Sequence, residues 1–158
     1  MTFRLPTKEF EASKYDGNKM LMRELVEEGK PVGLIAMHDD QTAGWIAFAP
    51  REDYIKIENS RAFKRIDKKP VWSITCFFIK KEYRRNGFSK LLIKGVIDYA
   101  KNHRIKILEA YPSIPYSKKV SPPFLWTGIL SAFIENGFTI VKQNGKSRAM
   151  VRLELSEP

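Results

Sequence analysis

The stretch VWSITCFFIKKEYRRNGFSKLL (Val71–Leu92) decides the fold. Its first nine residues, 71–79, are apolar on both alternating faces and rich in β-branched and aromatic side chains, which predicts a strand buried on both sides. From Phe88 to Tyr99, apolar residues recur at helical spacing. The stretch therefore predicts a strand, a charged turn and a helix in direct succession.

The turn between them has the features of an anion site. A helix that begins near Gly87 exposes unpaired backbone N–H groups, and its dipole places partial positive charge there. Glycine lets a ligand approach the backbone, and Arg84 and Arg85 add formal charge. Together these features predict a cradle for a diphosphate, although a solvated helix cap is the simpler interpretation. The sequence contains neither G-x-x-x-x-G-K-[ST] nor G-x-G-x-x-G, which argues against the common nucleotide motifs.

The remaining pattern predicts alternating helices and strands in one domain, residues 1–158, because no linker or repeat interrupts it. Gly95 lies on the apolar face of the helix after the turn, and since glycine costs roughly 1 kcal/mol there, we expect a close approach to the sheet. The basic segment 61–69 is predicted to be a solvated loop. The other expected elements, after an irregular lead, are a helix capped by Asn18 (19–28), strands 31–37, 42–49, 105–111, 138–143 and 148–155, a short helix within 51–69, and a helix 124–136.

Composition narrows the function classes. The chain has 158 residues and a net charge of +10, which favours polyanionic partners without choosing among them. The single cysteine, Cys76, excludes an internal disulfide and a cysteine zinc site, and the two histidines are far apart, so no metal is expected. The N-terminal stretch lacks a signal-peptide core, and no apolar run approaches the ~20 residues that span a bilayer. We therefore expect a cytoplasmic protein without membrane contact.

Arg84-x-x-Gly87-x-Ser89 resembles the R/Q-x-x-G-x-G/A signature of the GNAT N-acetyltransferase superfamily, which lies between the fourth strand and third helix of that fold. FIENGF (133–138) resembles the segment that ends the family's fourth helix, and the likeness covers roughly residues 31–155. The resemblance implies an α/β fold with a mixed, mainly antiparallel central sheet flanked by helices. It also implies direct transfer of the acetyl group of acetyl-CoA to an amine, whose identity the sequence leaves open.

The resemblance also implies which residues hold acetyl-CoA. Backbone groups of Phe78 and Ile79 would bind the pantetheine arm. The pyrophosphate would be held by backbone amides of Arg85, Asn86, Gly87, Phe88 and Ser89, with Lys90 nearby and side-chain contacts from Arg84 or Arg85. Ser89 replaces the usual glycine or alanine, so its hydroxyl either donates to phosphate or crowds it.

The catalytic residues are less clear, because Phe133 stands where many members carry the tyrosine that protonates the departing thiolate. Glu109 is the candidate base, because the end of its strand should border the cleft. The alternative interpretation of Glu109 is a surface carboxylate paired with a lysine. Tyr111 or Tyr116 would replace the missing acid, although loop tyrosines often simply pack. Trp126 is expected in the core, with the wall of an acceptor pocket as the alternative.

Two other function classes stay open. The basic clusters would also suit a nucleic-acid-binding module, although they are scattered along the sequence. A GNAT fold could also bind acyl-CoA as a sensor with little catalysis, since fold does not fix function. The first ~17 residues are short for the strand and helix that open many GNAT domains. The acceptor wall is therefore expected to be reduced or completed by a second subunit in a homodimer.

Overall fold

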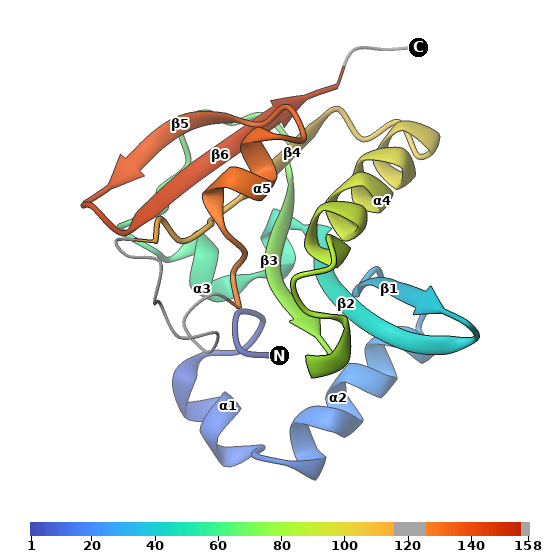
Figure 1. The fold of residues 1–158 in the computed structure, drawn as a ribbon. Helices are drawn as coiled ribbons and strands as arrows, with labels where there is room; N and C mark the ends of the chain where they lie inside the picture. The colour runs from blue at the N-terminus through green and yellow to red at the C-terminus, as the bar shows by residue number, and fades with distance from the viewer. Residues whose placement is uncertain (116–125, 156–158) are drawn as a thin grey trace.

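The computed structural model describes residues 1–115 and 126–155, which form one six-stranded sheet flanked by helices (Figure 1). The strand order is β1-β2-β3-β4-β6-β5. Only β3 and β4 pair in parallel, and every other pair is antiparallel. This arrangement confirms the expected mixed, mainly antiparallel sheet. The strands are β1 (Gly33–His38), β2 (Gln41–Pro50), β3 (Trp72–Ile79), β4 (Ile107–Ala110), β5 (Thr139–Asn144) and β6 (Arg148–Glu154).

The longest helix, α4 (Phe88–Asn102), covers one face of the sheet and organises the core (Figure 1). It buries an apolar stripe against side chains of β2, β3 and β4, and each buried leucine, isoleucine or valine of the stripe contributes about 1.5–3 kcal/mol. The stripe consists of Leu92, Ile93, Val96 and Ala100. The other helical segments are α1 (Thr7–Ala12), α2 (Asp16–Glu27), η1 (Arg51–Asp53), α3 (Ile55–Glu58), η2 (Lys81–Tyr83) and α5 (Leu130–Ile134). None of the helices in the described ranges is long and apolar enough to cross a membrane.

Both expected hairpins are present. β1 and β2 are joined through Asp39 and Asp40, which adopt φ values of 46° and 60°, a conformation that aspartate tolerates in tight turns. β5 and β6 flank Asn144-Gly145, and Gly145 has a φ of 62°. The short helix within 51–69 is also confirmed, because η1 and α3 begin that segment and a loop follows.

The expected helix 124–136 is wrong in its first half. Within the described residues α5 spans only Leu130–Ile134, while 124–125 lie outside them. Gly128 adopts a φ of 84°, and its carbonyl accepts a hydrogen bond from the Ser113 N–H, which ties this segment to the chain after β4. Long-range pairing therefore overrides the helical pattern.

The N-terminal region also departs from the prediction. Helix α1 lies in what was expected to be an irregular lead, and α2 begins at Asp16, before the predicted cap Asn18. The Asn18 side-chain amide instead donates to the Phe10 carbonyl, which links α2 to α1. Gly95 makes no close approach either, because a Cβ there would meet only Leu34 Cδ1, at 3.8 Å.

Candidate functional site

The sheet splits between its two parallel strands. β3 pairs with β4 only from Trp72 to Ile74, opposite Leu108–Ala110. β4 ends at Ala110, opposite Ile74, so the main-chain groups of β3 beyond Ile74 have no strand partner on this side among the described residues. A split of this kind can receive another extended chain, because unpaired strand groups need hydrogen-bond partners.

A bulge in β3 lies at the start of the split. Ala47 of β2 pairs with Cys76 and Phe48 pairs with Ile74, so Thr75 is an extra residue on β3. A bulge interrupts the alternation of side chains and re-aims those beside it. Thr75 and Cys76 accordingly both line one cavity on the face of the sheet opposite α4.

The main-chain groups of β3 after the bulge alternate between β2 and the split. The Lys80 N–H donates to Ala43 in β2, whereas the Phe77 N–H donates to the Trp126 carbonyl at 2.6 Å. Alternation then turns the main chain of Phe78 toward β2 and that of Ile79 toward the split. The main chain of Phe77 and Ile79 therefore faces the split, whereas that of Phe78, which was predicted to bind the cosubstrate, faces β2.

Residues 126–130 lie in the split itself. Besides the Trp126–Phe77 hydrogen bond, Gly128 and Leu130 pair with the main chain of Ser113 at 2.9 and 3.0 Å. The packing is tight, because a Cβ on Gly128 would lie 2.8 Å from the rings of both Phe77 and Phe133. This segment therefore connects β3 to the chain that follows β4.

The turn before α4 presents a row of free N–H groups. Arg85 and Gly87 both adopt left-handed φ values, 64° and 79°. Among the described residues, the N–H groups from Arg85 to Ser89 make no hydrogen bond, whereas the Lys90 and Leu91 N–H groups bond the Gly87 carbonyl. Successive N–H groups in such a turn form an anion-binding nest, and the α4 dipole adds positive potential. Residues Arg85 to Ser89 thus present a row of unpaired N–H groups at the positive end of the α4 dipole.

The side chains around this nest have distinct contacts. Arg84 Nε donates to the Ile79 carbonyl at 3.0 Å, which ties the turn to the end of β3. Lys90 forms an ion pair with Glu135, so its charge is partly neutralised. Phe88 packs against Tyr83 with ring centroids 5.3 Å apart, and so anchors the first turn of α4. A Cβ on Gly87 would meet no atom within 4 Å, which leaves open space over the nest.

The predicted base, Glu109, lies in a buried ion-pair network. It is 0% exposed, and Ser73, Glu109 and Arg152 are adjacent across β3, β4 and β6. One carboxylate oxygen accepts from Arg51 and the other from Arg152 Nη2 at 2.9 Å. Glu109 is neither a surface carboxylate nor paired with a lysine. A fully buried carboxylate held by two arginines is shielded from an acceptor amine, and this environment indicates a structural role.

The predicted acid, Tyr111, belongs to the same network. Its hydroxyl donates to Glu109 at 2.8 Å and lies 2.9 Å from the Ser73 hydroxyl, while Arg51 Nη1 lies 3.0 Å away. Burial, followed by the Glu109 charge, raises the pKa of Tyr111 well above its ordinary value of 10.0. Tyr116 lies outside the described residues. Phe133 is fully buried and packs edge-on against Phe77, in keeping with a core role.

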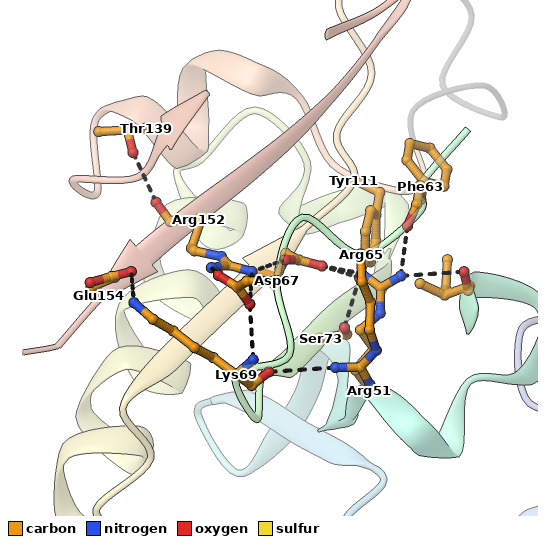
Figure 2. Close-up of polar contacts among 12 residues, drawn as sticks. Arg51, Phe63, Arg65, Asp67, Lys69, Ser73, Tyr111, Thr139, Arg152 and Glu154 are labelled. Carbon is orange, nitrogen blue, oxygen red and sulfur yellow. Dashed lines mark hydrogen bonds and ion pairs between the residues drawn. The ribbon is translucent and has the colours of Figure 1, made fainter. Parts of the chain in front are cut away.

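The basic segment is tied into this network rather than solvated throughout. Asp67 accepts a hydrogen bond from Arg152 Nη1, and Arg65 forms an ion pair with Glu58 at 3.0 Å. The Phe63 carbonyl accepts a hydrogen bond from Arg51. The Phe63 ring packs on Tyr111 with centroids 4.8 Å apart. The network therefore fixes the connection between β2 and β3 over one face of the sheet (Figure 2).

A cavity of about 100 Å³ lies against the bulge. Its walls come from residues 1–4, α2, β2, Tyr54, the bulge and Trp126, and most of them are aromatic or aliphatic. Burial raises the pKa of the Cys76 thiol and lowers that of the α-amino group of Met1, which also lines this cavity. The cavity therefore favours the neutral form of an amine. Across 1–115 and 126–155, no three histidine, cysteine or acidic side chains are grouped to hold a metal ion.

The cavity contains residues that the sequence did not single out, chiefly Tyr54 and Arg4. Arg4 is buried, forms an ion pair with Asp53 at 3.1 Å and lies over the Tyr54 ring at 4.9 Å. Neither residue belongs to a motif, and the only signal was the unusual run of charges around 51–58. Trp126, expected in the core, instead lines the cavity and stacks on Phe3 at 5.2 Å.

Comparisons with known proteins agree with this geometry. The model of the acetyltransferase (GNAT) family matches residues 1–120. Among solved structures, the chain is similar to ribosomal-protein-alanine N-acetyltransferase from Brucella melitensis, at 13% identity over 89% of this chain and 78% of that one, with a TM-score of 0.56. It is also similar to PaiA N-acetyltransferase from Thermoplasma acidophilum in complex with coenzyme A, at 17% identity over 96% and 80% of the two chains, with a TM-score of 0.55. A search of curated protein sequences found no match.

The split sheet, the turn before α4 and the family match define the class of protein: an acetyltransferase fold. The chain belongs to the acetyltransferase (GNAT) family.

Proposed function

We propose that this protein, as a single domain spanning residues 1–158, transfers the acetyl group of acetyl-CoA directly to a primary amine. The observation that carries the proposal is the nest of five free N–H groups, Arg85 to Ser89, located at the end of β3 where the sheet splits. A pyrophosphate carries the negative charge that such a nest binds best. The positive net charge of +10 would assist its capture.

The main chain on the split side of β3 would hold the rest of the cosubstrate. Ile79 faces the split and would pair with the pantetheine arm. The Phe77 N–H, two residues earlier, is the donor best placed to stabilise the oxyanion of the tetrahedral intermediate, once the Trp126 carbonyl releases it. In the reaction, the amine nitrogen forms a bond to the acetyl carbon, the carbon–sulfur bond breaks, CoA leaves as a thiolate, and the surplus amine proton leaves to solvent.

The predicted base and acid roles of Glu109 and Tyr111 stay predictions, because both side chains are enclosed in their network. The Glu109→Gln variant tests the base role. Burial lowers the pKa of the Met1 α-amino group in this cavity. An acceptor amine bound beside it would likewise tend to be neutral, which reduces the need for a strong base.

Isothermal titration calorimetry with acetyl-CoA tests the nest. Gly87→Glu places a negative charge in the open space over the N–H groups and should weaken binding at least about tenfold, a loss of about 1.4 kcal/mol. Gly145→Glu is the matched control, because Gly145 has a similar φ of 62° and equally open surroundings in the β5–β6 turn. Equal loss in both variants, or no binding by the wild type, would refute the proposal.

The same preparation tests the sensor alternative, which the occupied Phe77 N–H and the buried Phe133 favour. A sensor would bind acetyl-CoA but release no CoA thiol with any amine.

We also propose a cytoplasmic location, which suits the single cysteine. A homodimer that completes the acceptor wall is proposed as well. Size-exclusion chromatography with light scattering tests the dimer.

A further inference from the structure

One polar group in the cavity against the bulge lacks a partner. Tyr54 is only 2% exposed, and its hydroxyl makes no hydrogen bond to any described residue. The Thr75 hydroxyl and the Arg4 guanidinium are close enough to influence its titration, yet neither meets the geometry of a hydrogen bond. A buried unpaired hydroxyl costs stability, so its presence requires an explanation.

The position of the hydroxyl suggests that explanation. The cavity it lines is also bordered by Thr75 and Cys76, and Cys76 directly precedes Phe77, whose N–H is the proposed oxyanion donor. The cavity volume of about 100 Å³ greatly exceeds the roughly 10–15 Å³, in the same measure, that one water needs. The cavity thus has room for a ligand of several heavy atoms beside the place where transfer would occur.

The walls indicate the chemistry of that ligand. Trp45, Trp126 and Met22 supply apolar surface, and the one guanidinium nearby, that of Arg4, is already paired with Asp53. Burial raises the pKa of Tyr54 to about 12, so its hydroxyl stays protonated at neutral pH. A protonated phenol has an oxygen that accepts a hydrogen bond and carries no charge to attract a polycation.

We propose that the Tyr54 hydroxyl positions the acceptor: its oxygen accepts one N–H of a primary amine carried on a small apolar group. This inference rests on the proposed function and names the acceptor class for it. Accepting an N–H leaves the nitrogen lone pair free to attack the thioester. Tyr54 is therefore a positioning and specificity residue, and it exchanges no proton during transfer.

The test compares two buried tyrosines that differ in their partners. Tyr54→Phe removes an unpaired hydroxyl and should leave the urea midpoint unchanged or higher. Tyr111→Phe removes a hydroxyl that contacts Ser73, Glu109 and Arg51, and it should lower the midpoint. Activity is followed as release of the CoA thiol, with 2-phenylethylamine as the acceptor. The kcat/KM of the Tyr54→Phe variant should be about tenfold below that of the wild type, because KM rises while kcat is unchanged; this is the size expected for one lost hydrogen bond. Acetyl-CoA affinity by calorimetry should not change. Spermidine, a polycation, should be a poor acceptor for the wild type and for the Tyr54→Phe variant.

A second measurement does not depend on catalysis. Cys76 is the only cysteine in the sequence and lines the cavity, so its modification by methyl methanethiosulfonate reports occupancy. At pH 9, 2-phenylethylamine should slow this modification in the wild type, and the Tyr54→Phe variant should require about ten times more amine for equal protection. Absence of protection in the wild type, or equal protection in the variant, would overturn the assignment of Tyr54. Protection without any acetyl-CoA binding would support the cavity while the proposed function failed.

Discussion

Replacing Glu109 by glutamine discriminates between a structural and a catalytic role for this carboxylate. Glutamine keeps the shape of the side chain but removes the charge, and its NH2 group must face either Arg51 or Arg152, both of which only donate. Breaking a buried ion pair costs about 3–5 kcal/mol. The lower end applies here, since Arg51 keeps its ion pair with Glu58 and Arg152 keeps its ion pair with Asp67. We therefore expect the free energy of unfolding to fall by about 3 kcal/mol, or roughly 6–12 °C in Tm.

The assay is urea unfolding followed by tryptophan fluorescence, with the slope of the transition checked for two-state behaviour. Glu154→Gln is the matched control, because Glu154 lies on the neighbouring strand and pairs with Lys69 at 3.2 Å while 61% exposed. It should cost no more than about 1 kcal/mol. A Glu109→Gln protein within 1 kcal/mol of the wild type but without turnover would refute the structural reading and restore Glu109 as the base.

Two further predictions concern stability. Gly95→Ala should raise the free energy of unfolding by up to about 1 kcal/mol, since a Cβ meets only Leu34 at an ordinary 3.8 Å; a destabilised variant in urea unfolding would show that α4 packs more closely than described. Acid should weaken the protein through Glu58 and Asp67. Burial opposes the shift in Glu58, but hydrogen bonds from Arg65 and Arg51 outweigh it and lower the pKa below the ordinary 4.5. The hydrogen bond from Arg152 lowers the pKa of Asp67 below 3.8. A carboxylate with a depressed native pKa stabilises the fold above its unfolded pKa and loses that contribution as the pH falls through the native value. Urea midpoints should therefore change little from pH 7 to 5 on account of these groups and fall below about pH 4.5, and Glu58→Gln should flatten that fall. An identical acid profile for Glu58→Gln would contradict this origin.

The sequence was informative where the structure is local. β3, the turn and α4 are continuous in the chain, and their hydrophobic period, glycine and arginines carry the signal within about twenty residues. The turn at Gly87 and the start of α4 could therefore be predicted from the sequence. That this turn binds an anion stays a prediction.

The buried network and the cavity could not be predicted this way. Arg51 meets Glu109 across 58 residues of sequence, and Arg152 meets Asp67 across 85. Periodicity reports which face of one element is apolar, but not which distant charges meet beneath a loop. Glu109 at the end of a strand consequently suggested a cleft base, while the sheet register places it between two arginines.

The segment that crosses the split has a consequence for aggregation and for affinity. Because the Trp126 carbonyl pairs with the Phe77 N–H, the protein covers part of the strand edge that its split sheet would otherwise offer to other chains. A thioester oxygen that took over the Phe77 N–H would exchange one hydrogen bond for another, with little net gain from that contact. Under the proposed function, affinity for the cosubstrate would then come chiefly from its phosphates at Arg85–Ser89, and it should weaken steeply as salt screens that charge.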